Sequence, residues 1–446
     1  MELFLIKGGQ LILSLSLLIV LHELGHFIPA KLFKTRVEKF YLFFDVKFSL
    51  FKKKIGETVY GIGWLPLGGY VKISGMIDES MDTEQMAQPA QPWEFRAKPT
   101  WQRLIIMLGG VTVNLVLGFL IYMMVMFVWG KTVITNDTLA YGLAPTPTTA
   151  ALGFDVGDKI SSVDGMVLDD VMDINKWLFL RDVSNVEVVR ADGTNVTIAI
   201  PEDFGKQLFA AGEMIPFVPY IPAIIDRVVV GSSAEAAGLL ANDQIIGVDG
   251  TAINPWHPTT IPPVQVSNAF KQRQSEKVVM QISRDNIISE IEIPVAMGDT
   301  LGIYYKGTFP KATTYTYDVG QSIKEGFNYG YWTLYDYIAQ FKFVFTKKGA
   351  SQLGGFGTIG SLFPAEWNWR VFWERTALIS IILAFMNVLP IPALDGGHVV
   401  FLTYEMLTGR KPHQKVLEYA QMIGLFLLLG LFVFANGNDI YRFILS

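Results

Sequence analysis

The sequence contains no cysteine and only five histidines. The lack of cysteine excludes a disulfide framework and any zinc site built from thiolates, so a bound metal ion would need His, Asp or Glu ligands. Basic residues are not in excess either, since 36 Lys and Arg are outnumbered by 41 Asp and Glu and the formal net charge is −5. The charge balance gives no sign of a nucleic-acid partner.

Apolar residues are abundant. They make up 51% of the chain, and the mean hydropathy is +0.34. A chain of 446 residues is too long for one hydrophobic core, and its length predicts about two to four domains. These values together favour a polytopic membrane protein with a sizeable soluble part.

Four segments are long and apolar enough to span a lipid bilayer. We expect these membrane helices at residues 4–27, 104–129, 371–394 and 422–435, with the fourth extended backwards toward Leu417. The predicted fold class is therefore a polytopic α-helical membrane protein with four transmembrane helices. Residues 1–130 would hold the first two helices, and residues 371–446 would hold the last two.

The basic residues predict the orientation in the membrane, because cytoplasmic loops carry an excess of Lys and Arg. They follow the first span, precede the second, and lie between the third and the fourth: Lys31, Lys34, Arg36, Lys39, Lys47, Lys52, Lys53, Lys54, Arg96, Lys98, Arg103, Arg410, Lys411 and Lys415. We expect these loops to be cytoplasmic. Both termini and the long insertion, residues 131–370, would then lie on the opposite side.

The insertion contains an internal repeat. Residues 153–168 (GFDVGDKISSVDGMVL) and 238–253 (GLLANDQIIGVDGTAI) share a Gly, an Asp, an Ile and a Val-Asp-Gly triplet at equal spacing. The pattern predicts a turn followed by a strand that ends in an Asp-Gly turn, in two copies of one small β-rich domain. It resembles the PDZ domains of bacterial membrane and periplasmic proteases, although two unrelated β-rich modules are the alternative. The two PDZ-like domains would cover residues 131–215 and 216–309.

Two further segments bear on the membrane. Residues 317–348 are rich in aromatic side chains with a helical period, and they predict an amphipathic helix on the membrane surface or an ordinary soluble one. We assign residues 310–370 to this juxtamembrane region. Residues 60–73 are apolar, Gly-rich and β-like. They predict a membrane-associated β-hairpin that re-enters the bilayer, or else an ordinary cytoplasmic hairpin.

The first apolar segment carries His22, Glu23 and His26 in the motif HELGH. Positions i and i+4 share one face of a helix, so both imidazoles can bind one metal ion, and Glu23 can deprotonate a water molecule there. The motif is common by chance in soluble chains. An ionisable group near the bilayer centre, however, costs about 2.5–3.5 kcal/mol, and such groups are rare and usually functional. The motif therefore predicts a Zn²⁺ site with Glu23 as the catalytic base.

A catalytic zinc site needs a third protein ligand. The segment NVLPIPALDGGH, residues 387–398, places Asp395 near the predicted cytoplasmic end of the third apolar helix, which is the depth expected for His22 and His26. We predict Asp395 as the third ligand, and His398, one helical turn later, is the alternative. His257 lies in the insertion and His413 in a cytoplasmic loop, so neither is expected at that depth.

HELGH, NVLPIPALDGGH and the tandem insertion between them resemble the site-2 protease family of intramembrane zinc metalloproteases, in particular the bacterial regulator of sigma-E protease type. The resemblance extends over essentially the whole chain. It implies that His22, His26 and Asp395 bind zinc, that Glu23 is the catalytic base, and that Asn387 handles substrate. A bond from Asn387 to a neighbouring helix alone is the other interpretation.

Asn114, in the second apolar segment, has the same two interpretations, and we favour packing between helices for it.

The resemblance also implies the reaction and the substrates. The enzyme would cleave transmembrane segments of single-span membrane proteins in the bacterial inner membrane, among them a trimmed anti-sigma factor and remnant signal peptides. A transmembrane helix hides its carbonyls, so the substrate must unwind, and an edge of the 60–73 hairpin could then pair with it. The PDZ-like pair would act as a size filter or as a peptide sensor.

Two other functions remain possible on the sequence. One is a membrane metal-binding scaffold or transporter whose PDZ-like modules recruit partners, but such a site needs no carboxylate beside its ligands. The other is a zinc protease of the CaaX-processing kind, which usually takes its third ligand from a Glu and has no PDZ insertion.

Overall fold

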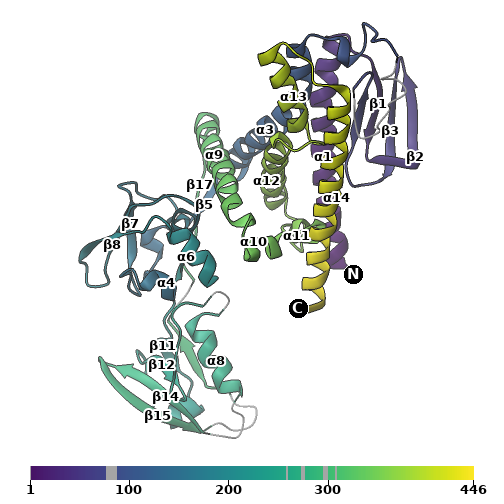
Figure 1. The fold of residues 1–446 in the computed structure, drawn as a ribbon. Helices are drawn as coiled ribbons and strands as arrows, with labels where there is room; N and C mark the ends of the chain where they lie inside the picture. Colours follow the sequence, from purple (N-terminus) through teal and green to yellow (C-terminus); the bar gives the residue numbers. More distant parts are fainter. Residues whose placement is uncertain are drawn as a thin grey trace. The chain divides into compact units, whose positions relative to one another are not determined.

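The computed structural model describes residues 2–76, 88–257, 260–272, 277–294, 300–306 and 309–445. The chain divides into two compact units (Figure 1). The first consists of Met1–Gly130 together with Thr316–Ser446, and the second is Lys131–Tyr315. Each unit has hydrophobic cores of its own.

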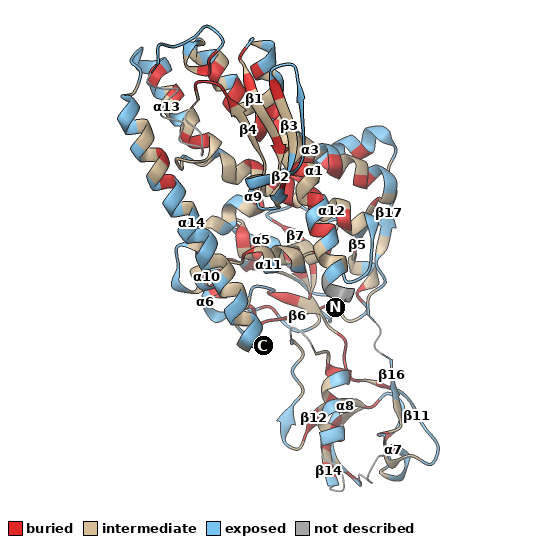
Figure 2. Ribbon diagram, turned by 90° about the vertical axis from the view of Figure 1, so that its right-hand side faces the viewer, coloured by how far each residue is buried: buried red, intermediate tan, exposed pale blue. Residues whose placement is uncertain are grey.

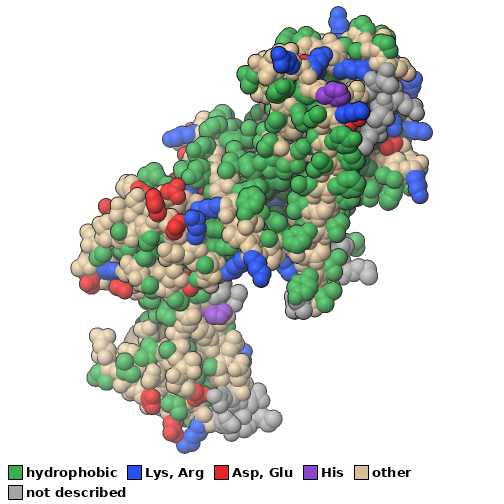
Figure 3. Space-filling model, in the orientation of Figure 1, with side chains coloured by type: hydrophobic (Ala, Val, Ile, Leu, Met, Phe, Trp, Pro, Cys, Tyr) green, Lys and Arg blue, Asp and Glu red, His purple; other side chains and the backbone are tan. Residues whose placement is uncertain are grey.

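Among its described residues, the first unit contains four helices that are long and apolar enough to cross a membrane. They are α1 (Glu2–Leu32), α3 (Thr100–Trp129), α12 (Trp369–Val388) and α14 (Gln414–Leu445). Four spans were predicted, and four are found. Figure 3 shows a broad band of apolar side chains over this unit, with Lys and Arg gathered at its upper end.

The predicted bounds of the last two spans were wrong. Helix α14 extends far beyond residues 422–435, because its polar C-terminal turns are hydrogen-bonded to the loop before α12. Helix α12 ends at Val388 instead of continuing to residue 394. Pro390 has no N–H to donate, and Leu389 before it is extended, with ψ 143°. The chain turns helical again as α13 (Asp395–Thr408). Asp395 therefore starts a separate helix rather than ending the third span.

Glycines allow α3 to approach α1 and α12 closely. A Cβ atom on Gly25 would overlap the backbone of Gly109, and one on Gly109 would overlap the backbone of Gly25. On another face of α3, Gly118 lies against Ile381 of α12. Small residues at helix crossings are typical of membrane proteins, where close backbone packing drives association.

A four-stranded sheet follows α1 along the chain. Its strands are β1 (Val37–Leu42), β2 (Phe44–Ile55), β3 (Thr58–Leu65) and β4 (Tyr70–Ile73), in the order β2-β3-β1-β4. Strand β1 pairs in parallel with β3 and antiparallel with β4. The predicted hairpin at residues 60–73 is therefore wrong, because β1 lies between β3 and β4. Strand β4 forms one edge of the sheet.

The aromatic segment after the second unit forms α9 (Val319–Val344), followed by α10 (Lys347–Gln352) and α11 (Phe356–Ser361). Asp318 begins α9 with a capping box. The helix packs against α3, with Gly326 at Met123 and Gly330 at Phe119. At the start of α11, the backbone N–H groups of Gly355 and Thr358 donate hydrogen bonds to the Asp439 carboxylate of α14.

The second unit contains two β-rich modules with separate cores, which Figure 2 shows in red. The elements of the first are β6 (Leu143–Pro145), α4 (Pro147–Ala150), β7 (Lys159–Val163), α5 (Ile174–Leu180), β8 (Asn185–Val189), β9 (Asn195–Ala199), α6 (Phe204–Ala211) and β10 (Phe217–Pro219). Those of the second are β11 (Ile225–Val228), α7 (Ser233–Ala236), β12 (Gln244–Val248), β13 (Thr251–Ala252), α8 (Pro262–Gln272), β14 (Lys277–Arg284), β15 (Ile287–Pro294) and β16 (Ile303–Tyr305). Strand β5 (Lys131–Val133) pairs with β17 (Thr313–Tyr315), so the ends of the unit meet.

The two repeated segments fold alike. In the first module, buried Asp158 accepts a hydrogen bond of 2.7 Å from Arg190, and Arg190 also donates to the carbonyl of Gly153 at 2.6 Å. The second module repeats this arrangement with Asp243, Arg284 and Gly238 in the same three roles. The repeat in the sequence therefore corresponds to a repeated hydrogen-bond network, in which an arginine holds a buried carboxylate and a turn.

Candidate active site

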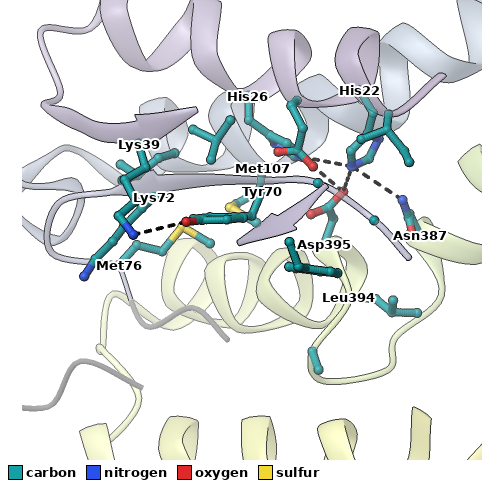
Figure 4. Close-up of a pocket in the computed structure, with 18 of the residues that line it drawn as sticks. His22, His26, Lys39, Tyr70, Lys72, Met76, Met107, Asn387, Leu394 and Asp395 are labelled. Atoms are coloured by element: carbon teal, nitrogen blue, oxygen red, sulfur yellow. Dashed lines mark hydrogen bonds and ion pairs between the residues drawn. The ribbon is translucent and has the colours of Figure 1, made fainter. Parts of the chain in front are cut away.

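The side chains of His22, His26 and Asp395 converge in the first unit (Figure 4). The two Nε2 atoms of the histidines are 3.2 Å apart. Oδ2 of Asp395 lies 3.3 Å from Nε2 of His22 and 3.4 Å from Nε2 of His26. We call these three residues the metal triad. Helix α1 supplies the histidines one turn apart, and the first turn of α13 supplies the carboxylate.

The metal triad fits a zinc ion. Oδ2 of Asp395 is buried and forms a regular hydrogen bond with neither histidine, although both Nε2 atoms lie close to it. Two imidazole nitrogens and one carboxylate oxygen are a typical donor set for catalytic zinc, with the fourth position left open for water or substrate. In the part of the chain that the structure describes, these residues form the group with metal-ligand geometry.

The loop before α13 fixes the position of Asp395. Cβ atoms on Gly396 or Gly397 would overlap the backbone of the preceding loop, so both glycines are needed for the tight entry into the helix. Ala393 has a left-handed φ of 76°, and its N–H donates to Oε1 of Gln421 in α14 at 3.2 Å. Backbone strain of this kind is often found at functional sites. The helix N-terminus also favours a carboxylate there.

Helix α3 contacts both imidazoles from the side opposite Asp395. The carbonyl oxygen of Ile106 is 2.8 Å from Nδ1 of His26, and the side-chain amide of Asn114 is 3.2 Å from Nδ1 of His22. Between them, Gly110 lies so close to both rings that a Cβ atom would overlap them. Packing between helices was the favoured interpretation of Asn114 from the sequence, and Ile106 and Gly110 were not expected at the site. The spacing of Gly110 and Asn114, i and i+4 on a membrane helix, is the signal that could have revealed them.

Glu23 and Asn387 also line the site. Glu23 is 9% exposed, and its carboxylate lies against the backbone N–H of Val71 in β4. The amide nitrogen of Asn387, near the end of α12, is 3.5 Å from Nε2 of His22, and Figure 4 shows this side chain directed at the triad. Both side chains therefore lie where a substrate carbonyl bound at the triad could reach them.

A cavity of about 620 Å³ opens beside the triad. Its walls come from α1, from β4 with the glycine loop before it, from the end of α12, and from α13. Tyr70, Lys39 and Lys72 line the side formed by the sheet (Figure 4). A cavity of this size is large enough for a short stretch of extended peptide.

The other histidines are not part of the triad. His398 lines the cavity one turn after Asp395 but does not belong to the group of converging ligand atoms. His413 lies before α14, where its Nδ1 accepts a hydrogen bond from the N–H of Lys415. His257 belongs to the second unit. Of the candidates considered from the sequence, the structure brings together His22, His26 and Asp395.

Comparison with known proteins supplies the family. A profile described as peptidase family M50 matches residues 10–431. The chain is 27% identical to the regulator of sigma E protease of Haemophilus influenzae, over 98% of this chain and 99% of the relative. It is 26% identical to the regulator of sigma-E protease RseP of Escherichia coli, over 98% and 99% of the two chains. It is 25% identical to the metalloprotease MmpA of Caulobacter vibrioides, over 99% and 96%.

The match extends over nearly the whole chain and includes both segments that build the metal triad. The chain therefore belongs to peptidase family M50, and it is a peptidase.

Proposed function

We propose that this protein is an intramembrane zinc metalloendopeptidase that cleaves the membrane-spanning segments of single-span membrane proteins. The observation that carries the proposal is the convergence of two Nε2 atoms and one carboxylate oxygen beside Glu23, where the histidines and Glu23 belong to a helix apolar enough to cross a membrane. Several relatives also carry the words zinc metalloprotease in their names. Membership of a peptidase family favours this function over a metal-binding scaffold or transporter.

His22, His26 and Asp395 would hold the zinc ion, through the two Nε2 atoms and Oδ2. Zinc bound by three protein ligands supplies a Lewis acid that polarises a carbonyl and acidifies a water molecule. Glu23 accepts the proton of the attacking water and then donates it to the leaving amine nitrogen. The backbone N–H of Val71 in β4 faces the Glu23 carboxylate. The third ligand is an aspartate, which argues against the CaaX-processing type.

The edge of β4 supports a mode of substrate binding. A transmembrane helix must unwind before its carbonyl groups can be attacked, and the freed backbone groups need new partners in the bilayer. Strand β4 lines the cavity at the edge of its sheet, and the N–H of Val71 points to the active-site side. An extended substrate can add to this edge as a further strand. The Asn387 amide would bind another part of the substrate backbone.

The basic residues at one end of the first unit support the membrane topology. The loop after α1, the start of α3 and the α13–α14 connection carry most of the unit's Lys and Arg, which favours a cytoplasmic location for them. The triad would then lie near the cytoplasmic side of a bacterial inner membrane. Both termini and the second unit would be extracytoplasmic. Relatives named as regulators of sigma-E protease suggest an anti-sigma factor as a substrate, with remnant signal peptides as others.

The two modules of the second unit would act as PDZ-like domains that exclude or sense the extracytoplasmic parts of substrates. Their shared Asp–Arg network and similar element order support two copies of one domain. Replacement of residues 131–315 by a short linker should allow cleavage of a substrate that keeps its bulky extracytoplasmic domain, measured against the trimmed substrate. Unchanged discrimination between the two substrates would contradict a size filter.

Glu23→Gln tests the mechanism. The variant should keep the zinc content of the wild type, because Glu23 is not a ligand, and should cleave a model transmembrane substrate more than about 10³-fold more slowly. Zinc is measured by metal analysis of the purified protein, and cleavage by gel assay. Glu202→Gln, at an exposed position in the second unit, is the matched control and should behave as the wild type. Cleavage by Glu23→Gln at the wild-type rate would refute the mechanism.

A further inference from the structure

One face of α3 is built to receive both imidazoles. Residues 106, 110 and 114 are spaced by four, so they lie in a row on the same face of the helix. The carbonyl of Ile106 contacts His26, Gly110 leaves room for both rings, and the amide of Asn114 contacts His22. The helix therefore determines where each ring lies and also which hydrogen-bond partner each Nδ1 atom has.

The partner of His26 determines where its ring proton lies. A carbonyl oxygen only accepts hydrogen bonds, so Nδ1 of His26 must carry the proton that it donates to Ile106 at 2.8 Å. Nε2 then has its lone pair free and directed at Oδ2 of Asp395, as a metal ligand requires.

The partner of His22 is an amide, which can accept through its oxygen or donate through its nitrogen. With Nδ2 of Asn114 toward Nδ1 of His22, the proton of His22 would have to lie on Nε2, the atom that faces Asp395. That orientation also leaves Oδ1 of Asn114 buried without a hydrogen-bond partner. The two ends of an amide have nearly the same shape, so the hydrogen-bond network decides between them.

We propose that Asn114 is a positioning residue for the metal site, with its Oδ1 atom accepting the Nδ1 proton of His22. This contact holds the ring in place and leaves the Nε2 lone pair free for the metal ion. The side chain suits this role because it is only 1% exposed. The backbone carbonyl of Asn114 separately accepts a hydrogen bond of 2.7 Å from Oγ of Ser380 in α12. The inference rests on the proposed zinc site.

Zinc retention by the full-length protein in detergent tests this role. Asn114→Leu keeps the branched shape of the side chain but removes the acceptor, and should lose zinc to a chelator at concentrations about 10–100-fold lower than the wild type. Asn114→Asp keeps an oxygen in place and should restore most of the retention. Ser380→Ala, which removes only the bond to the Asn114 backbone, is the control and should retain zinc as the wild type does. Thermal unfolding followed by tryptophan fluorescence reports the fold of each variant.

Two results would overturn the role of Asn114. One is wild-type zinc retention by Asn114→Leu. The other is an equal loss in Asn114→Leu and Asn114→Asp, because the oxygen would then not matter. A wild-type protein that binds no zinc would instead contradict the proposed function, which keeps the two failures distinguishable.

A second inference concerns the outer strand of the sheet. Apolar side chains at one end of the sheet are exposed, namely Val46, Phe48, Trp64 and Leu67 at 41–56%. Phe48 and Trp64 stack on each other with ring centroids 5.7 Å apart. At the other end of β2, Lys52, Lys53 and Lys54 are consecutive and exposed between exposed Phe51 and Ile55, and Lys47 is exposed among the apolar side chains of the first end. We call the first group the apolar tip and the second the lysine row.

Contacts with α1 and β1 show the depth of each end. Gly69, beside the apolar tip, lies against Ile19 in the middle of α1. Lys54 pairs with Val59, and the neighbouring Thr58 donates to the carbonyl of Val37, just after α1 ends. The apolar tip is therefore level with the membrane-spanning part of α1, and the lysine row is level with its basic end. This distribution matches the acyl and headgroup layers of one leaflet.

We propose that the lysine row binds the headgroups of anionic phospholipids and so holds the sheet, with its β4 edge, in place beside the cavity. Positive charge at headgroup depth complements an anionic leaflet, and each Lys near such a surface is worth about fivefold in affinity. The proposal rests on the membrane topology proposed above.

Full-length protein in nanodiscs of phosphatidylcholine, with or without phosphatidylglycerol, provides the test. Phosphatidylglycerol should accelerate cleavage of a model substrate by the wild type several-fold and should copurify with it. A triple variant, Lys52→Gln with Lys53→Gln and Lys54→Gln, should lose both effects while keeping its zinc. The matched control changes three other exposed lysines, Lys311, Lys324 and Lys347, to Gln, and should behave as the wild type.

Equal stimulation and equal lipid retention in the lysine-row variant would overturn the proposal. A wild type that is inactive in both kinds of nanodisc would contradict the proposed function, whereas the lipid retained by each variant would still report on the lysine row.

Discussion

Two aspartates with buried carboxylate oxygens, one in each unit, have opposite surroundings. In the second unit, Asp243 is held on both oxygens by Arg284 at 2.7 Å, and Oδ2 also accepts from the N–H of Leu240 at 2.8 Å. In the first unit, Oδ2 of Asp395 is buried without a regular hydrogen bond and lies between two imidazoles. Arg284 therefore pairs with both oxygens of Asp243. Oδ2 of Asp395, in contrast, can still accept a hydrogen bond or bind a cation.

The difference distinguishes a structural carboxylate from a ligand. Desolvation of a charged group is costly, so a buried carboxylate that holds a turn is expected to be paired within the protein, as Asp158 and Asp243 are by arginine. Oδ1 of Asp158 also lacks a hydrogen-bond partner, so an unpaired oxygen indicates a metal ligand only where imidazoles converge on it, as they do at Asp395. Oδ2 of Asp395 faces two imidazoles without a regular hydrogen bond, and a cation bound there would compensate for its burial. Substitution of Asp395 is therefore expected to affect zinc binding, and substitution of the partner of Asp243 is expected to affect stability.

The largest effect is expected for Asp395→Ala. Loss of the proposed third ligand should lower zinc occupancy strongly and reduce cleavage to background. The fold should be retained, because Oδ2 of Asp395 has no regular hydrogen bond to lose. Metal analysis and a cleavage assay measure the two effects. His398→Ala, one turn away, is the control and should keep its zinc. If His398→Ala lost zinc and Asp395→Ala did not, the ligand assignment would be wrong.

Arg284→Ala should have the next largest effect, on stability instead of chemistry. It leaves the Asp243 carboxylate buried and uncompensated, and we expect the second module to lose about 2–3 kcal/mol, since Arg284 is itself partly exposed to solvent. Hydrogen exchange of β12 and β14 in the full-length protein measures the change. Zinc content should stay that of the wild type. Loss of zinc without faster hydrogen exchange would contradict the assignment of a purely structural role to Asp243.

Gly110→Ala should have a smaller effect. The added methyl group would overlap both imidazoles and displace them from Asp395, so zinc affinity should fall by about 10–100-fold with the helices still packed. Competition with a chelator gives the affinity. Gly8→Ala is the control, because a Cβ atom there meets no other atom. Unaltered zinc affinity in Gly110→Ala would show that α3 does not position the rings.

The convergence of His22, His26 and Asp395 was largely predictable, since the helical spacing of HELGH places both imidazoles on one face of α1. Asp395 was named correctly as the residue that meets both histidines, but for a partly mistaken reason. It was placed at the end of a continuous third helix, whereas Pro390 ends that helix early and Asp395 begins the next one. Asp395 nevertheless lies beside both histidines, because the loop between α12 and α13 is short and packs tightly against the two glycines after Asp395.

The sheet was predicted less well than the site. The apolar, Gly-rich run at residues 60–73 has the composition of two strands with a turn, and a local pattern favours pairing between neighbours. In the structure β1 lies between β3 and β4, because β1 pairs with β3 in parallel. Pairing between strands that are not neighbours in the chain leaves no local pattern in the sequence. The roles of Ile106 and Gly110 were missed for the same reason, since a carbonyl and an absent side chain leave little trace in composition.

The sequence by itself determined the four membrane helices, the repeat of the second unit, and the chemistry of the ligands, because these depend on hydropathy, periodicity and residue type within short windows. Only the tertiary structure decided that α3 lies against both imidazoles, that Asp395 starts a helix, and that β4 forms the edge beside Glu23. Those features depend on close approach between segments far apart in the chain, which glycines and a proline break permit and local patterns do not encode.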